Sequence, residues 1–233
     1  MPNTNCFFVT STGTEIGKTF VSTKIIDYFL QHNFRIEPLK PILSGFDKKN
    51  IKESDSGKLL VSCKKKVSLS NISKMTPWLY ENPIAPSLAA KYENKKLIYR
   101  DVQKWCKKKK KNSKSDFLLF EGAGGLMVPI ERKKNFLDLF KSLKIPVILV
   151  VGSYLGTISH TLSALENLCN NDIRVINIIF NEGDKKNKNN DQNLELLKNS
   201  LKYKVLVRKL SYNSVYHDKE IKKIAKDVLR FFL

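Results

Sequence analysis

The sequence has no apolar run of the roughly 20 residues that a membrane-spanning helix needs. Residues 1–5 carry no charged side chain, and the apolar run that follows them is too short for a signal peptide. Cysteine is sparse, and Cys6, Cys63, Cys106 and Cys169 are scattered without a C-x-x-C pair. We therefore expect free thiols, a cytoplasmic location and no membrane partner.

Acidic residues are also few, because 22 Asp and Glu stand against 42 Lys and Arg, for a formal net charge of +20. Such an excess can indicate a nucleic-acid or anionic-membrane partner. The lysines gather in expected turns, however, without the interleaved arginines and aromatic residues that stacking on bases would favour. The main clusters are residues 64–66, 107–111 and 185–188. We interpret them as solvated surface loops and expect no specific nucleic-acid site.

Histidine is the rarest ionisable residue. His32, His160 and His217 are not spaced as metal ligands, and we assign none of them a catalytic role. The length of 233 residues, 42% of them apolar, suits one large α/β domain over residues 1–233.

The stretch TSTGTEIGKT, residues 10–19, lies between a short apolar run and a segment with helical spacing of apolar residues. Strand, glycine-bearing turn and helix form the context of a phosphate-binding loop, whose backbone N–H groups and helix N-terminus hold phosphate oxygens. We expect Lys18 to reach the terminal phosphates and Thr19 to bind Mg²⁺. The match is imperfect, because the strict motif has glycine where this chain has Thr12. The alternative is a plain turn between a strand and a helix.

A second expected strand, residues 34–39, runs into Lys40 and Pro41. Because proline does not fit a central strand, Lys40 and Ser44 should lie at a strand end, where open α/β sheets bind ligands. Farther along, Asp55 precedes a helical segment and is most simply a helix cap.

The apolar run 117–120 indicates a strand buried on both faces, and it ends at Glu121 beside three glycines. A charge at that tip is costly without a partner, so we favour a metal ligand over a tight turn with an incidental carboxylate. We expect Lys18, Thr19, Lys40, Asp55 and Glu121 to converge at the carboxyl edge of the sheet. Further strands are expected at 146–151, 175–180 and 205–207, and further helices at 88–92, around 102–105, from Thr157 or Ser159, at 193–201 and at the C-terminus. This alternation predicts a mostly parallel, doubly wound α/β sheet with helices on both faces, as in phosphate-loop NTPases.

Together these motifs resemble those of the dethiobiotin synthetases. The resemblance runs in order from about Phe7 to Asn181 and fades over the last fifty or so residues. The matching stretches are residues 8–19, 40–41, 44–45, 54–55, 83–86, 121–125, 150–152, 155–156 and Asn181.

The resemblance implies ATP-dependent closure of a cyclic urea from 7,8-diaminononanoate and CO₂, through a carbamate and a carbamic–phosphoric anhydride. It also implies a homodimer. By this resemblance, Lys18 and Lys40 lie beside the transferred phosphoryl group and Ser44 lies near the carbamate. The nucleotide is bound by Thr14, Glu15, Ile16, Gly17, Lys18 and Thr19, with Asn181 at the adenine edge, and Mg²⁺ is bound by Thr19, Asp55 and Glu121. The diamine substrate is bound by Lys40, Ser44, Gly122, Gly156, Thr157 and Ser159.

The chain departs from the family pattern at three positions. Ser11 replaces the first glycine of the family's loop, Gly13 replaces an aspartate that is common in the family, and Ser159 replaces an expected asparagine. A glycine at the first position usually serves a positive φ or a close approach to phosphate, so Ser11 should carry strain or sit in backbone relaxed by Gly13. Two other functions stay open: a partitioning-type ATPase of the same fold acting on DNA or membrane, and a related amide- or urea-forming ligase with another amine.

Overall fold

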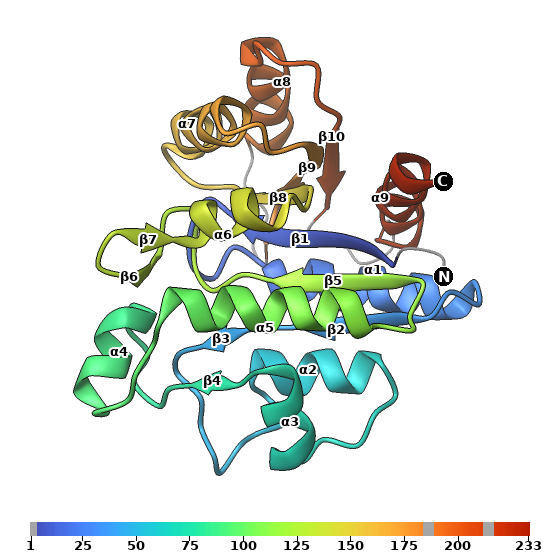
Figure 1. The fold of residues 1–233 in the computed structure, drawn as a ribbon. Coiled ribbons are helices and arrows are strands. Elements are labelled where there is room, and N and C mark those ends of the chain that lie inside the picture. The colour runs from blue at the N-terminus through green and yellow to red at the C-terminus, as the bar shows by residue number, and fades with distance from the viewer. Residues whose placement is uncertain (1–3, 184–188, 212–216) are drawn as a thin grey trace.

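A six-stranded parallel sheet forms the centre of the protein (Figure 1). The structure is a computed structural model that describes residues 4–183, 189–211 and 217–233. The strand order is β10-β9-β8-β1-β5-β2, with every neighbouring pair parallel. The predicted parallel sheet is therefore confirmed. Its strands are β1 (Asn5–Ser11), β2 (Ile36–Leu39), β5 (Phe117–Glu121), β8 (Val147–Gly152), β9 (Val175–Asn181) and β10 (Val207–Leu210).

Helices cover both faces of this sheet, as predicted. One apolar core includes residues of α1 (Lys18–Gln31), α2 (Asp55–Ser62), α3 (Leu69–Met75) and α9 (His217–Phe232). The other core includes residues of α4 (Pro86–Tyr92), α5 (Tyr99–Asn112), α6 (Phe136–Leu143), α7 (Thr157–Asn170) and α8 (Asn190–Ser200). Two small ribbons complete the described elements, β3 (Ile42–Leu43) with β4 (Trp78–Leu79) and β6 (Pro129–Glu131) with β7 (Lys134–Asn135).

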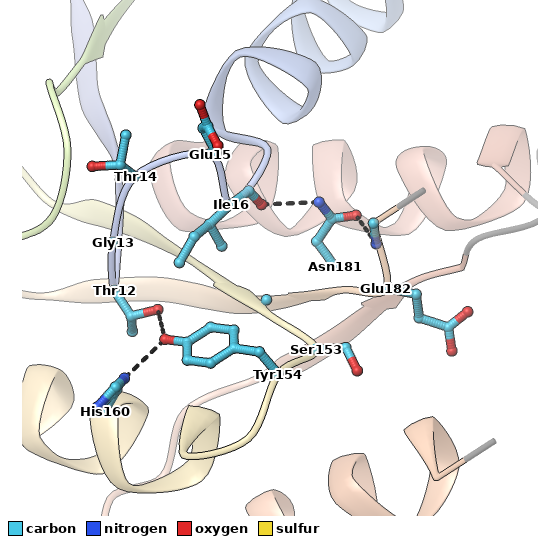
Figure 2. A pocket seen from close by; sticks show the side chains of 12 residues that line it. Thr12, Gly13, Thr14, Glu15, Ile16, Ser153, Tyr154, His160, Asn181 and Glu182 are labelled. Atoms are coloured by element: carbon cyan, nitrogen blue, oxygen red, sulfur yellow. Dashed lines mark hydrogen bonds between the residues drawn. The ribbon is translucent and has the colours of Figure 1, made fainter. Parts of the chain in front are cut away.

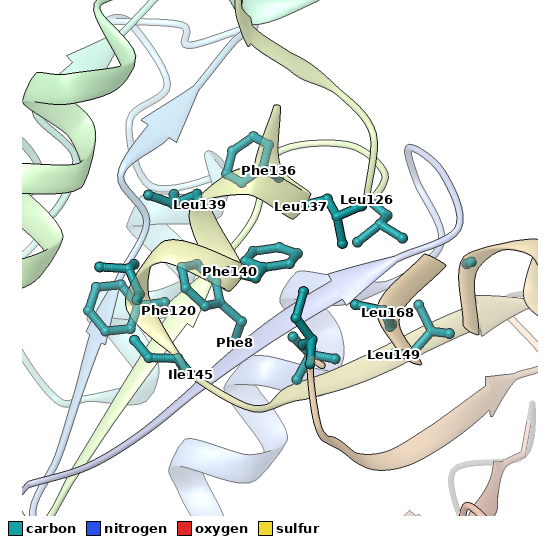
Figure 3. Packing of buried hydrophobic residues seen from close by; sticks show 14 of the residues in the cluster. Phe8, Phe120, Leu126, Phe136, Leu137, Leu139, Phe140, Ile145, Leu149 and Leu168 are labelled. Carbon is teal, nitrogen blue, oxygen red and sulfur yellow. The ribbon is translucent and has the colours of Figure 1, made fainter. Parts of the chain in front are cut away.

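The central strand β1 is buried on both faces, which explains its apolar run. Phe8 points into the core drawn in Figure 3, where its ring centroid lies 4.5 Å from that of Phe140 and 5.0 Å from that of Phe120. Its neighbours Phe7 and Val9 belong to the core on the opposite face. Aromatic packing thus fixes the strand that leads into the phosphate loop.

Helix α9 packs on the sheet through its apolar stripe, and Ile221, Ile224 and Val228 are buried. Its buried Asp227 accepts hydrogen bonds from Arg208 at 2.6 and 2.7 Å and from Asn177 at 3.2 Å, which ties the helix to β10 and β9. Within the described ranges, no helix has both the length and the apolar character needed to cross a membrane.

The lysine run 107–111 was expected to be a loop, and this expectation is wrong. The run forms the last turns of α5, because Val102 and Cys106 are buried one turn apart and keep the helix against the core. Lysine is a good helix former, and positive charge is favourable at a helix C-terminus. Residues 64–66 do lie outside helices and strands, whereas the run 185–188 falls outside the described residues.

Two helix caps also differ from the prediction. Ser54, not Asp55, caps α2, since its hydroxyl accepts the Gly57 N–H at 3.0 Å. At α7 the cap is Gly156 with φ 93°, rather than Thr157 or Ser159, and no side chain caps that helix. The sequence reading also missed α3, α6 and the two small ribbons.

Candidate functional site

The strand order brings the predicted polar residues to one edge of the sheet. Val9 of β1 pairs with Glu121 of β5, and Leu39 of β2 pairs with Phe120. The turn after β1, the carboxylate that ends β5 and Lys40 after β2 are therefore neighbours. This is the carboxyl edge at which open α/β sheets bind ligands.

The phosphate loop connects β1 to α1 and ends at Gly17, which caps the helix with φ 93°. A side chain at this position would be strained, and its Cβ would also lie 2.2 Å from Asn181 Nδ2. Asn181 in turn donates to the carbonyl of Ile16 at 2.9 Å. The loop is thus held from the neighbouring end of β9.

Lys18 is buried beneath this loop. Its ammonium donates to Ser11 Oγ at 3.1 Å and to the Gly13 carbonyl at 3.2 Å. Burial and the neighbouring Lys40 lower the pKa of Lys18 to about 8.

Ser11 is fully buried and does not have a positive φ, so of the two expected outcomes, strain or a backbone relaxed by Gly13, the strain is absent. Its hydroxyl lies 2.5 Å from the Gly13 carbonyl and 3.2 Å from the Gly124 carbonyl, and it accepts from Lys18. One side chain therefore contacts the phosphate loop, its lysine and the turn after β5.

Lys40 and Glu121 form an ion pair at 2.7 Å that is shielded from solvent, with side chains 1% and 0% exposed. Lys40 also pairs with Asp55 at 2.9 Å, and the Thr19 hydroxyl donates to the same Glu121 oxygen at 2.8 Å. Asp55, Thr19 and Glu121 belong to α2, α1 and β5, and Lys40 directly follows β2. The predicted convergence of Lys18, Thr19, Lys40, Asp55 and Glu121 is observed.

At Lys40 and Asp55, neighbouring opposite charges counter the effect of burial. Burial opposes the charge on Lys40, yet Glu121 and Asp55 raise its pKa above the ordinary lysine value. Burial likewise opposes the charge on Asp55, but Lys40 and the Thr19 hydroxyl lower its pKa. The second carboxylate oxygen of Glu121 is buried and makes no hydrogen bond within the described chain.

A cavity of about 670 Å³ opens beside the cluster. Ser44, whose buried hydroxyl also lacks a hydrogen-bond partner among the described residues, lies in its wall. The apolar segment 83–86 also lines this cavity, and it was not among the site residues predicted from the sequence. The only sequence feature that could have indicated this wall is the pair of prolines that flanks Ile84 and Ala85. The predicted residues that line this cavity are Thr14, Glu15, Ile16, Gly17, Lys18, Thr19, Lys40, Ser44 and Asp55.

Asn181 lies on the other side of the phosphate loop, in a second cavity of about 490 Å³ (Figure 2). Tyr154 crosses this cavity, and its hydroxyl lies 3.2 Å from Thr12 Oγ1 and 3.0 Å from His160 Nδ1. Sequence reading named neither Tyr154 nor His160 as a site residue. The adenine contact of Asn181 stays a prediction.

The predicted substrate-binding residues at the start of α7 do not line the main cavity. Gly156, Thr157 and Ser159 line a third cavity, of about 730 Å³. The Thr157 hydroxyl is already bonded to the Gly152 carbonyl at 2.5 Å. Gly122 touches the central cluster through its carbonyl, 3.4 Å from Lys40 Nζ.

Comparison with known proteins adds independent information to this geometry. Residues 5–215 match the family described as AAA domain. The chain is 37% identical over 175 residues to the ATP-dependent dethiobiotin synthetase of Caulobacter sp. (strain K31), with 75% of each chain covered. It is also 37% identical over 202 residues to the ATP-dependent dethiobiotin synthetase of Legionella pneumophila (strain Paris), with 87% of this chain and 92% of that one covered. The chain belongs to the dethiobiotin synthetase family.

Solved structures show the same fold at low sequence identity. Cobyrinic acid a,c-diamide synthase from Mycobacterium smegmatis, with a bound ATP analogue and magnesium, superposes with a TM-score of 0.60 at 14% identity, covering 98% of this chain and 96% of that one. The MinC:MinD cell division complex of Aquifex aeolicus gives a chain with a TM-score of 0.59 at 13% identity, covering 97% and 95%. These likenesses confirm the phosphate-loop NTPase fold, which dethiobiotin synthetases share with ATPases of the MinD type.

The role of the Ser11 hydroxyl can be tested by measuring nucleotide binding alone. We expect both Ser11→Gly and Ser11→Ala to weaken the affinity for a non-hydrolysable ATP analogue by about tenfold, or ~1.4 kcal/mol. The reason is that Lys18 loses an acceptor that holds its ammonium, and hydrogen bonds to charged groups contribute about 1.5–3 kcal/mol. Titration calorimetry measures the affinity.

The alanine variant keeps the Cβ, so an equal loss in both variants assigns the effect to the hydroxyl. Wild-type affinity in both variants would show that the hydroxyl does not position Lys18.

Proposed function

We propose that this chain is an ATP-dependent dethiobiotin synthetase that closes the ureido ring of dethiobiotin from 7,8-diaminononanoate and CO₂, in biotin biosynthesis. The observation that carries the proposal is the meeting of Lys18, Lys40 and Asp55 at one cavity, with Glu121 buried beside it as the ion-pair partner of Lys40, in a member of this family. Phosphoryl transfer mainly requires positioning and charge neutralisation, which such a cluster supplies. The four unpaired cysteines support a cytoplasmic location.

The proposed reaction has three steps. One amine of the diamine attacks CO₂ and loses a proton, which gives a carbamate. A carbamate oxygen then attacks the γ-phosphorus of ATP, so that ADP leaves and a carbamic–phosphoric anhydride forms. The second amine attacks the carbonyl carbon, and phosphate and a proton leave as the ring closes.

The basic residues have distinct parts in this proposal. Lys18 lies under the loop and stabilises charge on the terminal phosphates, while Lys40 lines the same cavity just after β2. Ser44, whose hydroxyl has no hydrogen-bond partner among the described residues, would hold the carbamate.

We propose Mg²⁺ as the cofactor, held by Thr19, Asp55 and Glu121. The free oxygen of Glu121 supports this assignment, because a buried carboxylate oxygen without a partner suits a hard cation. No group of three or more His, Cys, Asp or Glu gathers among the described residues. Two carboxylates and a hydroxyl suit Mg²⁺, which takes its remaining ligands from phosphates and water. When bound, the ion neutralises charge on the phosphates.

We propose a homodimer in which the α7 start of one subunit, with Gly156, Thr157 and Ser159, binds the distal carboxylate of the diamine acid. The separation of that cavity from the main one supports a second copy completing the site. Leu155, directly before this helix start, is fully exposed, as expected of an apolar contact between subunits.

The reaction predicts that phosphate release requires diaminononanoate and bicarbonate together, because the carbamate is the nucleophile. The measurement is steady-state phosphate release with ATP and Mg²⁺, with each substrate omitted in turn. Equal release without the diamine would refute the synthetase proposal. Release that depends instead on DNA or lipid vesicles would indicate a partitioning-type ATPase.

Lys18→Ala and Lys40→Ala should each lower kcat by about 10²–10³-fold, since each removes charge stabilisation from the transferred phosphoryl group. Lys40→Ala also leaves Glu121 buried without its partner, and breaking a buried ion pair costs about 3–5 kcal/mol. Its kcat must therefore be measured below its own melting temperature, with exposed Lys223→Ala as control. Near-wild-type kcat for folded Lys40→Ala would exclude Lys40 from the chemistry.

The homodimer predicts that Leu155→Asp lowers the sedimenting mass to that of a monomer, because a carboxylate replaces an apolar contact. Leu69→Asp, at an exposed leucine on α3, should remain a dimer. Sedimentation equilibrium distinguishes the two. A wild-type chain that is monomeric at all concentrations would contradict this proposal.

A further inference from the structure

The segment that closes the main cavity has little regular structure of its own. Residues 80–85 connect β4 to α4, which begins at Pro86, and residues 83–86 form an apolar part of the cavity wall. Backbone N–H groups outside a strand ladder need other hydrogen-bond partners. For Glu81 and Asn82 the partner is Glu93, which lies at the C-terminal cap of α4 outside the cavity.

Glu93 holds this segment at three points through one carboxylate oxygen. Its Oε1 accepts the backbone N–H of Glu81 at 2.7 Å, the backbone N–H of Asn82 at 3.0 Å and the Asn82 side-chain amide at 3.1 Å. The other oxygen accepts from Lys95 at 2.6 Å, and Lys95 also donates to the Leu79 carbonyl at 3.1 Å. The pair therefore clasps the whole segment 79–82.

The segment 79–82 is hydrogen-bonded directly to the residues that follow Ser44. The Asn82 carbonyl accepts the Gly45 N–H at 3.1 Å, and the Tyr80 carbonyl accepts the Phe46 N–H at 2.9 Å. Pro83 lies so close to Gly45 that an added Cβ there would come within 3.2 Å of the ring. The position of Ser44 and the position of the apolar wall are thus set together.

Partial burial works against the charge on Glu93, but the hydrogen bonds from Lys95, Asn82 and Glu81 lower its pKa to about 2. The hydrogen bonds that hold the segment therefore also favour the charged form of the Glu93 carboxylate.

We propose that Glu93 is a positioning residue that sets the shape of the cavity wall and thereby the length of amine substrate that the enzyme accepts. This inference rests on the proposed function. The wall of Pro83, Ile84, Ala85 and Pro86 is apolar, which suits the methylene chain of a diamine and not its charged ends. One methylene in an apolar pocket changes discrimination by about 10–200-fold, so a loosened wall should blur the choice of chain length.

The test compares Glu93→Ala, Glu93→Gln, Lys95→Met and the exposed control Glu195→Ala on the full-length protein. For Glu93→Ala we expect the KM for the diamine acid to rise about tenfold while the KM for ATP stays within twofold. We also expect the kcat/KM ratio between this substrate and an analogue one methylene shorter to fall at least threefold. Glu93→Gln and Lys95→Met should show smaller changes in the same direction, because each leaves part of the clasp. Glu195→Ala should match the wild type.

Equal increases in both KM values, or an unchanged chain-length ratio, would overturn the proposal, since a merely structural role predicts either result. Hydrogen exchange of the peptide covering residues 79–88, measured without substrate, provides a readout that is independent of turnover. We expect faster exchange there in Glu93→Ala and unchanged exchange in the peptide covering residues 12–19. If the wild type turns over no diamine, the proposed function fails, and this exchange pattern alone decides whether Glu93 holds the wall.

Discussion

The buried ion pair between Lys40 and Glu121 is the interaction on which the carboxyl edge of the sheet depends. Neither side chain has meaningful contact with solvent, so each charge depends on its partner at 2.7 Å, with further contacts from Asp55 to Lys40 and from the Thr19 hydroxyl to Glu121. The pair fixes β2 beside β5, and through the shared oxygen of Glu121 it also fixes the Thr19 hydroxyl at the start of α1. A site for a highly charged nucleotide is thus built around a nearly neutral centre, to which Asp55 and Lys18 add one charge of each sign.

The sequence was sufficient for the elements whose signal is local. The apolar runs of β1, β5 and β8 predicted buried parallel strands, and the Gly17-Lys18-Thr19 turn predicted a phosphate loop. Lys40 could be placed at a strand end because Pro41 follows it, and Glu121 because it ends the apolar run 117–120. The convergence of the charged residues followed from one rule about parallel sheets and needed no knowledge of strand order.

The features that the sequence did not predict depend on contacts between distant segments. The 107–111 run is helical because Val102 and Cys106 bury against the core, which a count of lysines does not reveal. Ser54 and Asp55 are adjacent, and only the structure shows that the serine caps the helix while the aspartate pairs with Lys40. The clasp by Glu93 joins residues more than ten positions apart through a side chain that carries no motif.

The residues of the main site that lie at strand ends are held in place differently from those that lie on helices. Lys40 and Glu121 stand at the ends of hydrogen-bonded neighbouring strands, so their separation is fixed by the sheet itself. Thr19 and Asp55 are carried by α1 and α2, which pack against each other and bury apolar side chains in the core on that face of the sheet. Their polar links to the strand ends are the Thr19–Glu121 hydrogen bond and the Asp55–Lys40 ion pair. The two strand residues are therefore held by a ladder of backbone hydrogen bonds, whereas the two helix residues are held by side-chain contacts.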